Sequence, residues 1–210
     1  MKKTTEIFLK VERLAQLEVF IAIICILMPL FLRWADGRSS FRDSISNYVY
    51  MENAHVFGFF ITAAALMFIY NGVLYFEKEK RMETLSAVSY SPIELPTGKY
   101  YNIVLGLGLL GVLFFPHENE NFKVIHYIFA GVFFAGSIIV MAFLSEKKHR
   151  KTGIFLATCA AIALLLYFIN ETWINLFWAE WIALIAIGIH YIIESQSSIG
   201  SVFDKIIPNV

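Results

Sequence analysis

The sequence predicts an all-α membrane protein, a polytopic bundle of six transmembrane helices, and three observations support this fold class. Hydrophobic residues make up 58% of the 210 residues and charged residues only 16%, whereas soluble domains are about 45–50% apolar and about 25% charged. The mean hydropathy is +0.64. The apolar residues are gathered into six segments that short polar or charged stretches separate.

Each apolar segment is long enough to cross a bilayer. The segments contain 16 to 22 residues, which suits a hydrocarbon layer of about 30 Å with some tilt or local thinning. Residues 1–16 have apolar side chains at helical spacing and are expected to form an amphipathic helix on the membrane surface. Residues 17–194 then form the transmembrane domain, and 195–210 form a cytoplasmic tail. The predicted spans are 17–34, 55–76, 100–115, 124–144, 152–169 and 173–193.

Lysine and arginine are distributed unequally between the two ends of the predicted bundle. Thirteen lie in the N-terminal segment, the second and fourth loops and the tail, whereas four lie in the first and third loops and none in the fifth. Because basic residues are retained on the cytoplasmic side, both termini are predicted to be cytoplasmic. We therefore expect a multi-pass protein of the cell membrane. The net charge of zero gives no indication of nucleic-acid binding.

Several glycines lie within the predicted spans. Gly106, Gly108 and Gly111 match the GxGxxG pattern of dinucleotide-binding sites, but they lie inside an apolar span with no preceding strand, so such a site is excluded. Close packing between helices is the predicted role of these glycines, and of Gly131 with Ala135 in the fourth span.

Glu180 lies about seven residues into the sixth span, roughly 10 Å below the preceding loop. A charged side chain within the hydrocarbon costs on the order of 2.5–3.5 kcal/mol, so it usually faces the protein interior and has a partner. His126 lies at a similar depth in the fourth span and is the predicted partner. The pair is interpreted either as part of a catalytic site or as a polar clamp between helices.

Ser46 is the predicted third member of this site, because it comes from the loop that leads into the second span. In a catalytic site Ser46 would be the nucleophile, His126 the base and Glu180 the group that orients the base. The alternative role of serines at this place is to cap a helix. Further binding residues are expected around the three, namely Ser44, Asn47, His55, His117 and Trp181.

The sequence suggests two kinds of ligand for this site, an anion or a metal ion. The second, fourth and sixth spans all begin at the outer face, and their free N–H groups favour an anion such as a lipid phosphate. A metal is not expected, since no HExxH spacing occurs; if one were bound, His55, His126 and Glu180 would be its ligands, with His117 nearby. The cofactor is unknown.

Three short motifs resemble those of the FRAG/DRAM/Sfk group of six-helix membrane proteins. They are Ile45-Ser46-Asn47 before the second span, His126 with Ala130 in the fourth, and Ala179-Glu180-Trp181 in the sixth. Asn47 stands where the group usually has an acid. Members of this group are linked to lipid remodelling, membrane scaffolding and autophagy. The resemblance implies that Ser46, His126 and Glu180 belong to one site.

Together these features predict an outward-facing polar pocket within the membrane that binds or modifies a membrane lipid. The alternative is a non-enzymatic scaffold or sensor in which Ser46, His126 and Glu180 only hold helices together. A transporter or channel is disfavoured, because the first, third and fifth spans carry no charge in mid-membrane and no acid or base in the inner half continues a path to the cytosol.

Overall fold

The regular elements of the described chain are all helices. A computed structural model describes residues 2–86, 101–118, 120–145 and 148–206. Residue 100 of the predicted third span and residues 207–210 of the predicted tail lie outside this part. The elements are α1 (Lys2–Asp36), the 3-10 helix η1 (Ser46–Tyr50), α2 (Ala54–Ser86), α3 (Tyr101–Phe114), α4 (Glu120–Ile139), the π-helix η2 (Val140–Leu144), α5 (Arg150–Ile169) and α6 (Leu176–Ile206).

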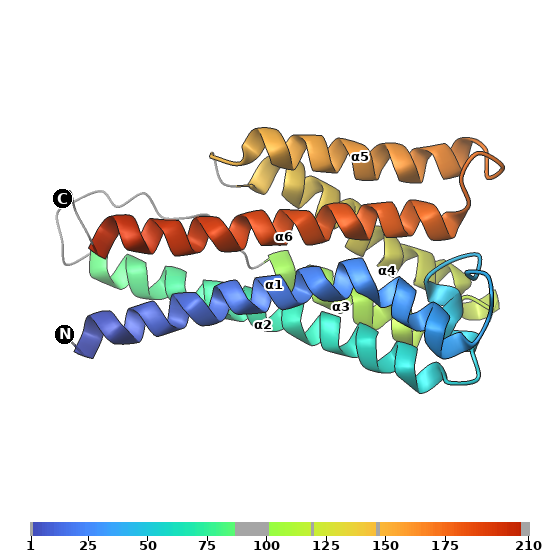
Figure 1. The fold of residues 1–210 in the computed structure, drawn as a ribbon, viewed down its shortest axis with the longest axis horizontal. Helices are drawn as coiled ribbons and strands as arrows, with labels where there is room; N and C mark the ends of the chain where they lie inside the picture. Colours follow the sequence, from blue (N-terminus) through green and yellow to red (C-terminus); the bar gives the residue numbers. More distant parts are fainter. Residues whose placement is uncertain (1, 87–100, 119, 146–147, 207–210) are drawn as a thin grey trace.

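The six α-helices run lengthwise beside one another, and the first residues of α1 and the last residues of α6 lie at the same end of the bundle (Figure 1). We call this the terminal end, and the opposite end, with residues 37–53, 115–118 and 170–175, the loop end. Five helices contain segments that are long and apolar enough to cross a membrane. The shorter helix α3 has 14 residues, most of them apolar, and is about 21 Å long.

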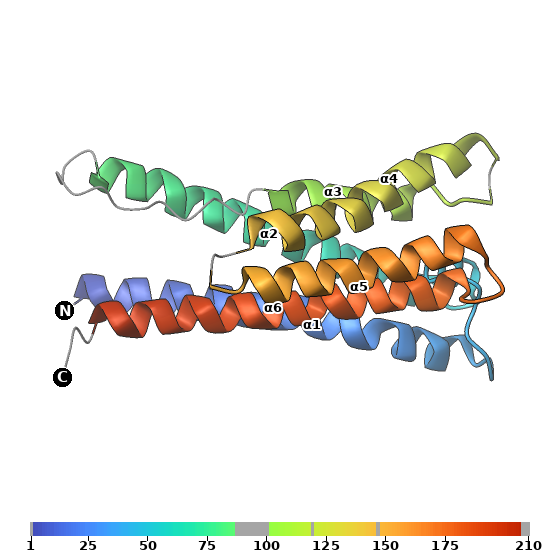
Figure 2. The ribbon, with the colours of Figure 1, turned by 90° about the horizontal axis from the view of Figure 1, so that it is seen from above.

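Each helix packs against its neighbours in the chain, and α6 returns to pack along α1, so the helices form a closed ring. Figure 2 shows α1, α6 and α5 in one layer, and α3 and α4 in the other. Between the layers lies an apolar core, in which the ring of Phe68 on α2 contacts Phe133 on α4 and Tyr191 on α6 at centroid distances of 5.7 and 5.2 Å.

The helices extend beyond the predicted spans. Residues 2–16 of the expected surface helix and the first span are parts of the single helix α1, and residue 1 lies outside the described residues. Most of the expected tail, residues 195–206, is the last part of α6. The predicted start of the sixth span at Trp173 is three residues early, because residues 170–175 form the turn that leads into α6.

Three of the four conspicuous glycines have the predicted packing role. A Cβ atom added at Gly106 would lie 2.6 Å from the Ala65 carbonyl oxygen on α2. Added at Gly111, it would lie 2.1 Å from the ring of Phe129 on α4, and at Gly108 it would lie 3.2 Å from the carbonyl oxygen of the same residue. The prediction for Gly131 is wrong. This glycine is exposed on α4 and nothing lies within 4 Å of its Cβ position.

Gly106→Ala should therefore destabilise the protein by about 1–3 kcal/mol, because the added methyl group meets backbone that cannot move aside without shifting a helix. Gly131→Ala is the matched control, since its methyl group meets open space. Thermal unfolding in detergent measures both. Equal midpoints for the two variants would contradict the close approach of α3 to α2.

Candidate functional site

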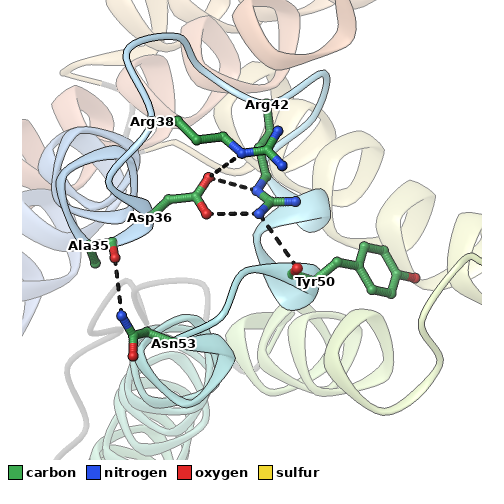
Figure 3. Close-up of polar contacts among 6 residues, drawn as sticks. All are labelled: Ala35, Asp36, Arg38, Arg42, Tyr50 and Asn53. Carbon is green, nitrogen blue, oxygen red and sulfur yellow. Dashed lines mark hydrogen bonds and ion pairs between the residues drawn. The ribbon is translucent and has the colours of Figure 1, made fainter.

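The first loop, residues 37–53, is attached to the end of α1 by an ion pair (Figure 3). The Arg42 guanidinium donates two hydrogen bonds to the Asp36 carboxylate, both at 2.8 Å, and Arg38 lies 3.6 Å from the same carboxylate. At the other end of the loop, the Asn53 amide donates to the Ala35 carbonyl at 3.3 Å. A two-bond arginine–carboxylate pair fixes orientation as well as distance. The loop is thus held at both of its ends.

The same loop is also hydrogen-bonded to the first turns of α6. The Phe177 N–H donates to the Asp43 carbonyl at 2.8 Å, and the Ile45 N–H donates to Glu180 Oε2 at 2.7 Å. Glu180 is buried, with 8% of its surface exposed. Its hydrogen-bond partner is therefore a backbone N–H of the first loop.

His126 makes its hydrogen bond elsewhere. Its Nδ1–H donates to the Phe115 carbonyl at 2.8 Å, and its ring lies 5.3 Å from that of His117. Across the described residues no hydrogen bond joins His126 to Glu180, so the predicted pair does not form. The physical reason is that each group meets a nearer backbone partner, the end of α3 for the imidazole and the first loop for the carboxylate.

Ser46 belongs to the first loop but forms no pair with a base. Its Oγ atom lies 3.1 Å from Ser44 Oγ, which accepts a hydrogen bond from the Asn47 N–H at 3.2 Å. Ser44 thus bonds the first turn of η1, whose N-cap residue is Ile45, whereas the predicted capping of the second span by Ser46 or Asn47 is not seen. The nucleophile–base contact of a Ser–His–Glu site is not formed in this structure.

A polar pocket of about 470 Å³ opens at the loop end of the bundle. We call it the Asp43 pocket; it is lined by Asp43, Ser44 and Asn47 of the first loop, His117, Tyr167 of α5, Glu171, Asn175 and Leu176. Three of the predicted binding residues, Ser44, Asn47 and His117, are among its lining. Three distant parts of the chain build this pocket, namely the first loop, the segment after α3 and the segment that joins α5 to α6.

The other two predicted binding residues are not in the lining. His55 is exposed near the start of α2. The Trp181 indole donates to the Ile26 carbonyl of α1 at 3.0 Å, and its ring is stacked on that of Trp178 at 5.3 Å. Trp181 therefore joins α6 to α1.

The N-terminus of α6 does not offer the expected anion site. Three successive N–H groups are already bonded: that of Phe177 to the first loop, that of Trp178 to the Asn175 side chain and that of Ala179 to the Asn175 carbonyl. The lining residues include two carboxylates and no lysine or arginine. A phosphate group would meet negative charge in the Asp43 pocket.

The alternative metal site is not assembled. Over the described ranges, no group of three or more His, Cys, Asp or Glu side chains lies close enough to hold a metal ion. The proposed ligands His55, His126 and Glu180 are therefore not brought together.

A second polar cluster, at mid-length of α1 and α6, was missed by the sequence reasoning. The Tyr191 hydroxyl donates to Asn102 Oδ1 at 2.6 Å, the Asn102 amide donates to Asn71 Oδ1 at 2.6 Å, and the Asn71 amide donates to Glu18 Oε1 at 3.4 Å. All four side chains are buried. This asparagine network joins α6, α3, α2 and α1 through hydrogen bonds that all run toward one carboxylate.

The asparagine network includes a buried acid of the first predicted span, Glu18, which the sequence reasoning did not consider. Glu194 and His190 of α6 are also buried. The sequence signal was present, since Asn71 and Asn102 each stand within an apolar run. Amides so placed usually hydrogen-bond across helices.

Asn102→Leu should lower the stability by about 1–3 kcal/mol, because it removes the acceptor of Tyr191 and the donor to Asn71 in a buried place. Tyr191→Phe removes only the first of these bonds and should cost less. Unfolding midpoints of the two variants in detergent test this order. If Asn102→Leu were as stable as the wild type, the network would have no role in stability.

Burial lowers the pKa of His117 below its ordinary value of 6.5, an effect that Glu118 opposes and Lys123 adds to. The unfolded chain therefore binds this proton more readily than the folded chain. The free energy of unfolding should therefore be highest above pH 6.5. It should decrease as the pH falls from 6.5 toward the lower pKa that His117 has in the folded protein. His117→Gln should remove this part of the pH dependence between about pH 7.5 and about pH 5.5.

The measurement is the unfolding midpoint of the wild type and of His117→Gln at both pH values. His55→Gln, which changes an exposed histidine outside the Asp43 pocket, is the control and should follow the wild type. A wild type that lost no more stability than His117→Gln on acidification would refute the effect.

Comparison with known proteins gives a family. Residues 27–195 match a family model whose description is "Family of unknown function (DUF7103)". No curated protein and no solved structure matches the chain. Because the match covers most of the chain, the protein belongs to the DUF7103 family.

Proposed function

We propose that this DUF7103 protein is a multi-pass protein of the cell membrane, with cytoplasmic termini, and that its Asp43 pocket faces outward and binds the headgroup of a membrane lipid. Five membrane-length apolar helices support the location. The unequal distribution of lysine and arginine supports the orientation, since the terminal end is the basic one.

The observation that carries the proposal is the position of the Asp43 pocket beside exposed apolar surface. Phe168 and Ile169 follow the lining residue Tyr167 on α5 and are 77% and 69% exposed; Trp173, between the lining residues Glu171 and Asn175, is 67% exposed. A polar cavity next to such a surface matches a molecule that has a polar headgroup and an apolar chain. The aromatic residue Trp173 also suits the boundary between the two.

We propose binding rather than chemical modification, because the groups needed for acyl transfer are not joined. Ser46 Oγ faces Ser44, His126 donates to a carbonyl and Glu180 accepts from the first loop. In this proposal Glu180 secures the loop that lines the Asp43 pocket. The resemblance to the FRAG/DRAM/Sfk group, which we retain as a proposal, points to lipids in the same way.

The second candidate function is a non-enzymatic scaffold or sensor. Glu180 and the asparagine network favour it, since both use buried polar groups to join helices or loops. In a pure scaffold the Asp43 pocket would hold no specific lipid. The two candidates therefore differ in bound lipid and not in fold.

The double variant Asn47→Ala/His117→Ala should retain several-fold less co-purified lipid than the wild type. The reason is that it removes two polar groups of the pocket lining. A hydrogen bond from each group to the ligand would contribute about 1 kcal/mol to binding. Native mass spectrometry of the protein released from detergent measures the bound lipid. His55→Ala, at the same end but outside the lining, is the control and should retain wild-type occupancy.

Unfolding midpoints of the variants separate a binding defect from a folding defect. Unchanged lipid occupancy in a folded Asn47→Ala/His117→Ala protein would reject the lipid site and leave the scaffold. Glu180→Leu should lower the midpoint under either function, because the buried Ile45 N–H loses its acceptor, at a cost of about 1–3 kcal/mol.

A further inference from the structure

We infer that the Asp43 pocket recognises a neutral polyhydroxyl headgroup, so that its ligand is a lipid whose polar end is a sugar or a similar polyol. This inference rests on the proposed function and names the ligand class of the same pocket. Two features support it: the side-chain atoms that the lining leaves accessible, and a buried carboxylate beneath the lining.

The free end of each amide in the lining is its nitrogen. Asn47 Oδ1 is buried and has no hydrogen-bond partner among the described residues, whereas Nδ2 of the same amide keeps accessible surface. Asn175 Oδ1 accepts a hydrogen bond from the Trp178 N–H, which leaves Nδ2 as its free end. An amide nitrogen donates hydrogen bonds and does not accept them. The two asparagines therefore offer N–H donors to a ligand in the pocket.

Two further lining groups can both donate and accept. The Tyr167 hydroxyl keeps accessible surface and has no hydrogen-bond partner in the described part of the chain. His117 has its Nδ1 buried and its Nε2 accessible, and Nε2 donates in one neutral tautomer and accepts in the other. The exposed carboxylates of Asp43 and Glu171 add acceptors. The lining thus mixes donors with acceptors.

Glu180 supplies a further acceptor beneath this lining. Its Oε2 accepts the hydrogen bond from the Ile45 N–H. Oε1 has no hydrogen bond among the described residues and keeps accessible surface, although Glu180 as a whole is only 8% exposed. Glu180 lies one helical turn after the lining residue Leu176, on the same face of α6, and its carboxylate interacts electrostatically with the hydroxyl of the lining residue Tyr167. The free oxygen of Glu180 is therefore directed toward the inner end of the pocket.

A hydroxyl group is the ligand group that suits such a mixture of donors and acceptors. Each hydroxyl donates one hydrogen bond and accepts up to two, so neighbouring hydroxyls of a polyol can accept from the amide nitrogens and donate to the carboxylates. An ammonium group only donates and would meet N–H donors at both asparagines. A phosphate diester only accepts, and it would meet two carboxylates in a lining that has no lysine or arginine. Both charged headgroups are therefore disfavoured.

The experiment titrates the purified full-length protein with glucosyl-diacylglycerol, diacylglycerol, phosphatidylethanolamine and phosphatidylglycerol of matched acyl chains. Native mass spectrometry reads the bound fraction. The detergent is a polyoxyethylene ether, because a glucoside or maltoside detergent carries the same kind of headgroup and would compete. The wild type should bind the glucosyl lipid roughly tenfold more tightly than diacylglycerol, on the scale of one or two net hydrogen bonds. This affinity should be the same at about 0.05 M and about 0.5 M salt, because salt does not screen a neutral headgroup.

Tyr167→Phe removes one lining hydroxyl and should weaken glucosyl-lipid binding about fivefold, the loss of one hydrogen bond. Tyr127→Phe is the matched control, since Tyr127 is a half-exposed residue of α4 outside the lining, and it should bind like the wild type. Asn47→Leu is the second variant, which removes an amide donor and should weaken binding by a similar factor. Neither Tyr167→Phe nor Asn47→Leu removes a side-chain hydrogen bond within the described chain, so both should keep the wild-type unfolding midpoint.

The outcomes separate the inference from the function on which it rests. Equal binding of glucosyl-diacylglycerol and diacylglycerol, or preferred binding of either phospholipid, would overturn polyol recognition while lipid binding stands. Wild-type binding in both Tyr167→Phe and Asn47→Leu would also overturn it, as would an equal loss in Tyr127→Phe, because the headgroup would then not lie in the Asp43 pocket.

A parallel titration with methyl glucoside tests the source of the hydroxyl groups. If methyl glucoside bound with the same dependence on Tyr167 and no lipid bound, polyol recognition would stand and the lipid function would fall. If neither methyl glucoside nor any of the four lipids bound, both would fall.

Discussion

The buried hydrogen bond from the Ile45 N–H to the Glu180 carboxylate is the interaction on which the loop end depends. A hydrogen bond to a charged group contributes about 1.5–3 kcal/mol, and its loss leaves a buried donor unsatisfied. Because the Phe177 N–H bonds the Asp43 carbonyl beside it, α6 holds the first loop at two points. Asp43, Ser44 and Asn47 flank Ile45, so the wall of the Asp43 pocket is fixed by the same contact.

The polar groups at the loop end and those of the asparagine network have different roles. At the loop end, backbone-directed bonds of Glu180 and His126 leave the neighbouring lining residues open to a ligand. At mid-length of α1 and α6, the polar atoms of the asparagine network bond one another and so join four helices. Burial alone therefore does not distinguish a binding group from a structural one, and the direction of the hydrogen bonds does.

The helical fold and the polar character of the loop end could be predicted from the sequence, because hydropathy and turn residues act locally along the chain. For this reason Ser44, Asn47 and His117 were expected at one end of the bundle, where they line the Asp43 pocket. The pairing of Glu180 could not be predicted, because depth in the membrane does not say which way a side chain points around its helix. The pairing of Asn71 with Asn102 could not be predicted either, because an amide within an apolar segment does not say which helix its partner lies on. Gly131 showed that a small residue on a helix marks close packing only where another helix passes.

The closed ring of helices has a consequence for how the protein is made. Helix α1 is synthesised first, yet α6, its partner along the length of the bundle, is synthesised last. The asparagine network that begins at Glu18 of α1 therefore lacks Tyr191, and the first loop lacks Glu180, until α6 has been made. Contacts between residues so distant in sequence form late. A chain made only as far as α5 would thus contain Glu18 and both asparagines of the network but not Tyr191, and its first loop would lack the two contacts to α6 that fix the wall of the Asp43 pocket.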